Sequence, residues 1–328
     1  MREEAREEVT DTQTGRGGKN SPSIYVGPDD NEFAPEHTEA MVEAVERGGG
    51  KVLTTPDEAE AVVWLEPGGL ELADLLHPGV RWVQLPAAGI EAWTESGLID
   101  ERRVFTSARG AYSETVAEHA LALMLAGARR LHEFARDRGW EKRFGRPLAG
   151  STVVILGAGG IGNALIRMLE PLNVTILAVT RSGREVPGAD ESFSAGETDQ
   201  LWPRGDFFVV AAPATDATSA MIGAPQLAAM QDHAWLVNVA RGSLIDTDAL
   251  VEALANERIG GAALDVTAPE PLPEDHPLWT EPCALITSHT ANPPEALTRA
   301  LAERIEENVA HFKAGEELIG VVDAEAGY

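Results

Sequence analysis

Four ionisable side chains that can bind an anion or transfer a proton follow short apolar runs of the sequence. They are Arg241, Asp265, Glu270 and His289. In an open parallel α/β sheet, ligands bind beyond the carboxyl ends of the strands, so we expect these side chains to meet around one ligand. A guanidinium donates two parallel hydrogen bonds to a carboxylate, and an imidazole, with an ordinary pKa of about 6.5, suits proton transfer near neutral pH. The pattern therefore favours proton transfer to a small anionic substrate.

The sequence holds eight histidines, and their positions distinguish the candidate for acid–base chemistry from the others. His289 lies just after a strand-like run, where a ligand is expected. His276 is its nearest rival but lies in the proline-rich loop EDHPLW, and His119 lies at the start of a predicted helix, where it is structural or close to a cofactor. No HExxH motif or other cluster has the spacing of metal ligands, so we expect no metal.

A glycine-rich turn is the strongest local motif. It has the pattern GxGxxG and stands between an apolar, strand-like run and a helix-like stretch. In such a turn the first glycine makes the bend, the second admits a pyrophosphate to the backbone, and the third lets the helix pack on the strand. The helix N-terminus then faces the phosphates. A turn without a ligand is the alternative, but the context favours a dinucleotide bound by Gly157, Gly159, Gly160, Ile161 and Gly162.

The segment after the next strand indicates which dinucleotide binds. A site for NAD usually has an acidic residue about 20 positions beyond the glycine loop. Here the strand runs instead into Thr180, Arg181, Ser182 and Arg184. Hydroxyl and guanidinium groups can hold a 2′-phosphate that a carboxylate would repel. Although both arginines could be ordinary surface residues, we expect NADP as the preferred cofactor, with NAD possible.

Alternating strand-like and helix-like runs must position these residues. Helical stretches are predicted at 35–49, 113–138 and 294–314, and short apolar runs alternate with polar stretches before and after the second of them. This alternation is typical of parallel sheets with helices on their faces. We predict an α/β fold with two Rossmann-like, doubly wound parallel-sheet domains and the active site in the cleft between them.

Composition shifts along the chain indicate the domain limits. Residues 1–20 contain few apolar side chains and end in a Gly-rich run, which predicts a flexible tail. Residues 21–112 together with 291–328 are expected to form a discontinuous substrate domain. Residues 113–290 are expected to form the dinucleotide-binding domain.

The composition also excludes several classes of protein. With 26 Lys and Arg against 53 Asp and Glu, the net charge of −27 disfavours binding to nucleic acid or an anionic membrane surface. The longest apolar stretch, 120–128, is far shorter than the roughly 20 residues of a spanning helix. The polar N-terminus lacks the apolar core of a secretory signal, and the single Cys283 permits no internal disulfide. We expect a cytoplasmic protein.

In their order along the chain, these motifs resemble the D-isomer-specific 2-hydroxyacid dehydrogenase family, which includes glyoxylate/hydroxypyruvate reductases. The resemblance covers nearly everything after the tail, including Val-Ala-Glu at 116–118, Gly-Trp at 139–140 and Gly-Tyr at 327–328. It implies an NAD(P)-dependent enzyme that reduces a small 2-oxo acid to the D-2-hydroxy acid. Segment 113–148 resembles the family's dimerisation region, which implies a homodimer.

The resemblance also implies roles for the catalytic residues. Arg241 grips the substrate carboxylate and polarises the 2-oxo group, and His289 protonates that oxygen while hydride reaches C2. Glu270 forms a hydrogen bond with the imidazole. These roles fit the chemistry of the reduction. Negative charge builds on the carbonyl oxygen, which needs a proton donor, and the cofactor supplies the hydride.

Further residues are expected to bind the two ligands. Asp265 matches the family residue that holds the nicotinamide carboxamide. Ala88 and Gly89 match a small loop whose N–H groups contact the substrate carboxylate. Pro213 and Ala240 complete the expected cofactor contacts.

The chain departs from the family pattern beside the histidine. Ser288 replaces the usual proline and Asn292 replaces a common glycine, and both can alter the pocket floor. The formate dehydrogenase branch commonly has glutamine in place of Glu270, so formate is disfavoured. Two alternatives stay open, a non-catalytic dinucleotide sensor like the corepressors of this fold and an enzyme acting on another small anion such as phosphite.

Overall fold

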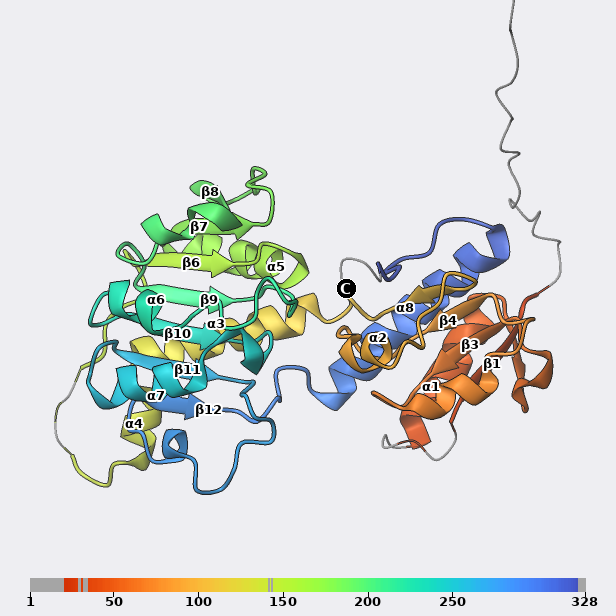
Figure 1. Ribbon diagram of the computed structural model, residues 1–328, viewed down its shortest axis with the longest axis horizontal. Helices are drawn as coiled ribbons and strands as arrows, with labels where there is room; N and C mark the ends of the chain where they lie inside the picture. Colours follow the sequence, from red (N-terminus) through yellow and green to blue (C-terminus); the bar gives the residue numbers. More distant parts are fainter. Residues whose placement is uncertain (1–20, 29–30, 32–34, 141, 143, 324–328) are drawn as a thin grey trace, which may run out of the picture. The chain divides into compact units, whose positions relative to one another are not determined.

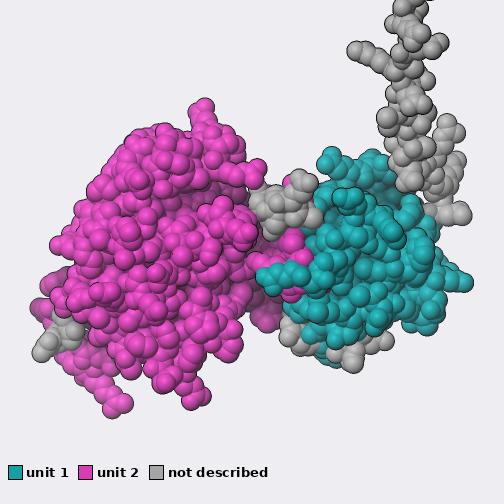
Figure 2. Space-filling model, viewed as in Figure 1, with its two compact units in different colours: residues 1–86, 95–107, 301–322 teal, residues 87–94, 108–300, 323–328 magenta. Residues whose placement is uncertain are grey.

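The computed structural model describes residues 21–28, 31, 35–140, 142 and 144–323. The expected tail and the closing Gly-Tyr pair lie outside these residues. The chain forms two compact units (Figure 2). Unit 1 consists of residues 1–86, 95–107 and 301–322, and unit 2 of residues 87–94, 108–300 and 323–328. The domain limits expected from the sequence differ from these units mainly at 87–94 and 291–300, and they stay a prediction.

Unit 1 is built on a five-stranded parallel sheet in the order β2-β1-β3-β4-β5. Its strands are β1 (Ser23–Gly27), β2 (Lys51–Leu53), β3 (Ala61–Trp64), β4 (Trp82–Gln84) and β5 (Val104–Thr106). Helix α1 (Pro35–Arg47) buries Met41, Ala44 and Val45, which lie three and four residues apart and so share one face. Helices α2 (Glu91–Glu95) and α8 (Pro294–Ala314) each begin in unit 2 and end in unit 1.

Unit 2 is built on a seven-stranded parallel sheet in the order β12-β11-β10-β9-β6-β7-β8 (Figure 1). Its strands are β6 (Thr152–Leu156), β7 (Thr175–Thr180), β8 (Glu191–Ser194), β9 (Phe207–Val210), β10 (Trp235–Asn238), β11 (Gly261–Leu264) and β12 (Ala284–Ile286). Its helices are α3 (Ser113–Ala128), α4 (Leu131–Arg136), α5 (Gly160–Leu169), α6 (Ala224–Ala229) and α7 (Thr247–Ala255).

The two faces of this sheet have separate apolar cores. Along β6, Val153 and Ile155 pack into the core that includes α3 and α5, whereas Val154 and Leu156 pack into the core that includes α6 and α7. Successive side chains of a strand point to opposite faces, so a strand covered on both faces must be apolar throughout. This explains the uninterrupted apolar runs of the sequence, and the prediction of two parallel-sheet α/β folds is confirmed.

Two details differ from the sequence-based expectation. The helix predicted over 113–138 is two helices, because Arg130 adopts a left-handed φ of 54° between α3 and α4. Strand β8 was not expected, since only Phe193 of its four residues is buried and the segment carries no apolar run. None of the described helices is long and apolar enough to span a membrane.

Because all seven strands of unit 2 are parallel, their carboxyl ends lie along one edge of the sheet. The loops that leave this edge carry nearly all the residues expected to act in binding and catalysis. Thr180 is the last residue of β7, and Gly160, Ile161 and Gly162 lie in the first turn of α5. Ala88 and Gly89 come from the segment after β4.

Candidate active site

The glycines of the turn after β6 differ in backbone conformation and in the space around them. Gly157 has a φ of 109°, which side-chain-bearing residues rarely adopt. A Cβ atom at Gly162 would collide with the carbonyl oxygen of Gly157, and one at Gly160 would collide with Oγ of Ser113, so both glycines allow α5 to pack closely. A Cβ atom at Gly159 would meet no atom within 4 Å. The turn therefore leaves open space at the glycine expected to face a pyrophosphate.

The segment after β7 lies beside this turn. Arg184 donates a hydrogen bond from Nη2 to the carbonyl oxygen of Ala158, at 3.1 Å, which ties the segment to the glycine turn. Arg181 and Ser182 are exposed. Thr180 is buried, and its hydroxyl has no hydrogen-bond partner among the described residues. The end of β7 thus presents the Arg181 guanidinium and the unpartnered Thr180 hydroxyl next to the turn.

The remaining expected cofactor residues follow β9 and β10. Pro213 is exposed in the loop after β9, and its carbonyl oxygen accepts a hydrogen bond from the hydroxyl of Thr218 at 2.8 Å. Ala240 is buried in the loop after β10. Ile161, in the first turn of α5, is half-buried.

His289 and Glu270, which the sequence predicts as an acid–base pair, are in contact. Nδ1 of His289 lies 2.6 Å from Oε1 of Glu270, and the two side chains are 53% and 42% exposed. The second carboxylate oxygen accepts a hydrogen bond from the N–H of Thr267 at 3.4 Å. A carboxylate only accepts hydrogen bonds, so Nδ1 carries the hydrogen of this contact. Nε2 is consequently the ring atom that can exchange a proton with a substrate.

Asp265 anchors the loop that carries His289. Its Oδ1 atom accepts hydrogen bonds from the Thr287 hydroxyl at 2.7 Å and the Thr290 N–H at 2.8 Å, and its Oδ2 atom accepts one from the Ala291 N–H at 3.1 Å. Burial raises the pKa of Asp265, but the hydrogen bonds from His119, Thr287 and the two backbone N–H groups outweigh burial and leave the pKa below its ordinary value. Asp265 is therefore a carboxylate at neutral pH.

Arg241 is held by its own loop and by an acidic side chain. Its Nη1 atom donates to the carbonyl oxygen of Ala240 at 2.7 Å, and its Nε atom pairs with Oε1 of Glu91 at 3.1 Å. A Cβ atom at Gly89 would collide with Nη2 of Arg241, so the backbone of the expected substrate loop lies directly against the guanidinium. Ala88, the neighbouring residue, is exposed.

The expected site residues thus form three groups in the structure. Arg241 lies with Gly89, His289 lies with Glu270 and Asp265, and the segment after β7 lies with the glycine turn. Within the described part of the chain, no hydrogen bond or ion pair joins Arg241 to His289. His276, the rival histidine, accepts a hydrogen bond at Nδ1 from the N–H of Leu278 at 3.3 Å and so caps a short helix.

Two residues that position Arg241 were not singled out from the sequence. Asn238 is fully buried at the end of β10, where its side chain donates to the carbonyl oxygen of Arg241 at 2.8 Å and accepts from the N–H of Ala240 at 3.0 Å. A Cβ atom at Gly242 would overlap the backbone of Thr267, so this glycine brings the arginine loop against the segment before Glu270. Asn238 and Gly242 belong to the motif Asn-Val-Ala-Arg-Gly around Arg241, and this proximity is the sequence signal that could have identified them.

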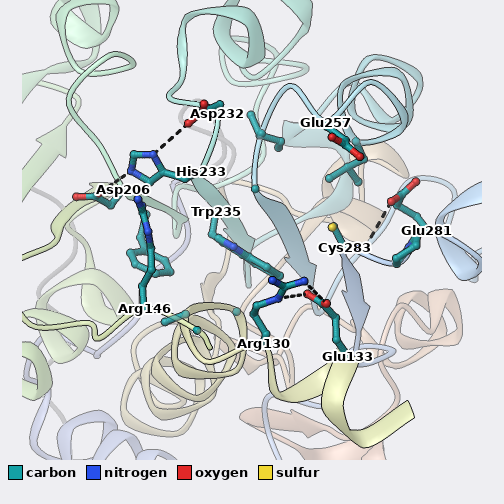
Figure 3. A pocket seen from close by; sticks show the side chains of 18 of the residues that line it. Arg130, Glu133, Arg146, Asp206, Asp232, His233, Trp235, Glu257, Glu281 and Cys283 are labelled. Atoms are coloured by element: carbon teal, nitrogen blue, oxygen red, sulfur yellow. Dashed lines mark hydrogen bonds and ion pairs between the residues drawn. The ribbon is translucent and has the colours of Figure 1, made fainter. Parts of the chain in front are cut away.

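A cavity of unit 2 lies away from these residues (Figure 3). It has a volume of about 820 Å³ and is lined by Phe207 and Trp235, the first residues of β9 and β10, and by polar groups such as Arg130, Glu133 and His233. It therefore opens at the amino ends of the strands. None of the residues expected to act in catalysis or cofactor binding lines this cavity.

Comparison with known proteins identifies the family of this chain. Residues 121–291 match the model of the D-isomer specific 2-hydroxyacid dehydrogenase, NAD binding domain. The chain belongs to the D-isomer specific 2-hydroxyacid dehydrogenase family. It is thus an oxidoreductase that uses a nicotinamide dinucleotide.

Relatives match over most of this chain. An uncharacterised protein from the proB 3′ region of Corynebacterium melassecola is 40% identical over 303 residues, which cover 90% of this chain and 98% of that protein. A protein of Pectobacterium carotovorum named glyoxylate/hydroxypyruvate reductase B is 31% identical over 80% of this chain and 86% of its own length. The solved structure of a family member from Xanthobacter autotrophicus, in complex with NADPH and MES, has a TM-score of 0.82 and 26% identity over 94% of this chain and 100% of that chain.

Proposed function

We propose that this dehydrogenase reduces a small 2-oxo acid of the glyoxylate or hydroxypyruvate type to the D-2-hydroxy acid and prefers NADPH to NADH. The contact between His289 and Glu270 at 2.6 Å is the observation that carries the proposal. It provides a proton donor held in one orientation at the edge of the sheet where a ligand of this fold binds. The names of relatives such as glyoxylate/hydroxypyruvate reductase B agree with it.

In the proposed reaction, each side chain has one task. Arg241 orients the substrate through its carboxylate, aided by the N–H groups of Ala88 and Gly89. His289 gives the proton on Nε2 to the 2-oxo oxygen, and Glu270 keeps the ring in place through Nδ1. When bound, the nicotinamide supplies the hydride that reaches C2.

The contact between Glu91 and Arg241 bears on substrate binding. Because Nε of Arg241 pairs with the Glu91 carboxylate, an incoming substrate carboxylate must replace or share that partner. Both side chains are partly exposed, so the pair is weak enough for such an exchange.

The residues present fit a dinucleotide with a 2′-phosphate. Gly159 leaves open space at the glycine turn, and α5 begins there with its N–H groups unpaired within the helix. Arg181, Ser182 and the buried hydroxyl of Thr180 lie at the adjacent strand end, and no carboxylate occupies the position of a ribose-binding acid. This combination supports the preference for NADPH.

We also propose that the chain forms a homodimer through the region 113–148. Leu131, Trp140 and Phe144 are 54%, 98% and 81% exposed in this region. Large apolar side chains gathered in one exposed segment are typical of an interaction surface.

The proposed activity is tested by the loss of absorbance at 340 nm, with NADPH and NADH in parallel. The substrates are glyoxylate, hydroxypyruvate, pyruvate, phenylpyruvate and a branched 2-oxo acid, with phosphite and NADP⁺ as a separate reaction. Turnover of a 2-oxo acid that is faster with NADPH supports the proposal. Tight NADPH binding without turnover would instead indicate a dinucleotide sensor, and reduction of NADP⁺ by phosphite would indicate the other small-anion enzyme.

A further inference from the structure

Helix α3 brings His119 to the loop that carries His289. Nε2 of His119 lies 2.9 Å from Oγ1 of Thr287 and 3.3 Å from Oδ1 of Asp265. Thr287 is the first residue after β12, and Asp265 is the first residue after β11. His119 therefore contacts the first residue after each of the two strands whose loops carry Glu270 and His289.

The hydrogen atoms of this cluster can be placed from its geometry. Thr287 donates its only hydroxyl hydrogen to the Asp265 carboxylate, which can only accept. Oγ1 of Thr287 must then accept from His119. Nε2 of His119 consequently carries a hydrogen whether the ring is neutral or charged.

The loop needs this support because its backbone is strained. Ser288 and His289 have φ values of 45° and 56°, in the left-handed region that residues other than glycine rarely adopt. Such a conformation persists only where the surrounding structure over-determines it. Asp265 does so from both sides of the turn, through Thr287 before it and through the N–H groups of Thr290 and Ala291 after it.

We propose that His119 is a positioning residue for proton transfer. Its Nε2–H holds Thr287 and Asp265 in the arrangement that stabilises the left-handed turn, and the turn keeps the imidazole of His289 against Glu270. The effect on catalysis rests on the proposed function, in which His289 is the proton donor. The effect on the loop does not, because it depends only on the hydrogen bonds.

Two substitutions of His119 separate the effect of its hydrogen bond from the effect of the space that its side chain fills. His119→Gln keeps an N–H donor at nearly the same distance from the backbone, whereas His119→Leu fills the space without a donor. His233→Leu is the matched control, because His233 also contacts a carboxylate, Asp206 at 2.7 Å, but does so at the opposite edge of the same sheet.

The kinetic test uses steady-state reduction of the 2-oxo acid by NADPH. We expect His119→Leu to lower kcat about tenfold or more, with the substrate KM changed less than about twofold, because a small displacement of the proton donor slows chemistry. His119→Gln should recover kcat to within about threefold of wild type, and His233→Leu should leave it unchanged. Equal losses in the glutamine and leucine variants, or a loss confined to KM, would overturn the proposal.

A second readout needs no catalysis. Amide hydrogen exchange at Thr290 and Ala291 should be on the order of tenfold faster in His119→Leu than in wild type and unchanged in His119→Gln. Unaltered protection of both amides in the leucine variant would remove His119 from the support of the loop. If wild type reduced no 2-oxo acid but the exchange result held, the proposed function would fail while the support of the loop by His119 would stand.

Discussion

At the residue scale, Glu270 determines which nitrogen of His289 is available for proton exchange. The contact at 2.6 Å occupies Nδ1, so only Nε2 can exchange a proton with a substrate. A neutral imidazole has one donor and one acceptor nitrogen, and a fixed partner removes the choice between its tautomers. In the proposed reaction, the pair therefore directs proton transfer through Nε2.

His289→Ala tests that role. We expect kcat to fall by about two orders of magnitude or more, because the substitution removes the proton donor. The Kd for NADPH, measured by nucleotide fluorescence, should stay close to the wild-type value, since no expected cofactor contact is lost. Turnover close to wild type would remove His289 from the mechanism.

The lowered pKa of Asp265 predicts how the free energy of unfolding depends on pH. Its pKa in the folded protein lies below the ordinary 3.8, so its contribution to folding is present at pH values above 3.8 and is lost as the pH falls through the lower, folded value. The free energy of unfolding of wild type should therefore exceed that of Asp265→Asn at pH 7, and the difference should shrink in acid. Denaturant titrations at a series of pH values measure it, and a difference that grows in acid would contradict the assignment of Asp265 as a carboxylate.

At the scale of elements, the turn between β6 and α5 shows two uses of glycine. Gly162 is required by the protein's own packing, because a Cβ atom there meets the carbonyl oxygen of Gly157. Gly159 has open space around its Cβ position, so the described residues do not themselves require glycine there. We propose that Gly162 serves the fold and that Gly159 serves binding.

Gly159→Ala and Gly162→Ala form a matched pair. Gly159→Ala should leave the Tm close to wild type but weaken NADPH binding about tenfold or more, because the methyl group occupies space needed by the pyrophosphate. Gly162→Ala should destabilise the protein by about 1–3 kcal/mol, because α5 must move away from the turn. Thermal melts and NADPH titrations distinguish them, and equal effects on both measurements would contradict this division.

The strand end after β7 should set the choice of cofactor. Arg181→Ala is expected to raise the Kd for NADPH about tenfold or more and to change that for NADH little, because only NADPH carries the 2′-phosphate. Parallel fluorescence titrations with the two nucleotides provide the comparison. Equal losses for both would discard the role of Arg181 at the phosphate.

At the scale of the whole molecule, the net charge of −27 opposes the binding of two anionic ligands. At physiological salt, however, charges are screened over about 8 Å, so distant acidic side chains have little influence. We expect Arg181, Arg241 and the N-terminus of α5 to determine the sign of the electrostatic potential at the proposed site. The global charge therefore does not conflict with a 2-oxo acid substrate.

The exposed apolar side chains predict the oligomeric state. At micromolar concentration, light scattering should give twice the mass of one chain. The double variant Trp140→Ser and Phe144→Ser should shift this mass toward that of a single chain, because it removes apolar surface from the proposed interface. A monomeric mass for wild type would overturn the proposal of a homodimer.

The order of elements could be predicted from the sequence because it depends on local patterns. Apolar runs identified the parallel strands, and the limits expected for the last helix, 294–314, are those of α8. Strand β8 escaped prediction because an edge strand buries little and so carries little apolar pattern. The break at Arg130 escaped because a single left-handed residue leaves no signal in the spacing of apolar side chains.

The sequence by itself determined the family and the fold class. It also predicted a candidate site, since Arg241, Glu270, His289 and the glycine turn stand in short motifs after strands, and parallel strands carry their ends to one edge. Only the tertiary structure decided which groups hold them. His119 contacts Thr287 and Asp265, and Glu91 contacts Arg241, across separations in the chain that no local pattern records. Hydrogen bonds form between atoms that are close in space, and a sequence specifies that closeness only once it has folded.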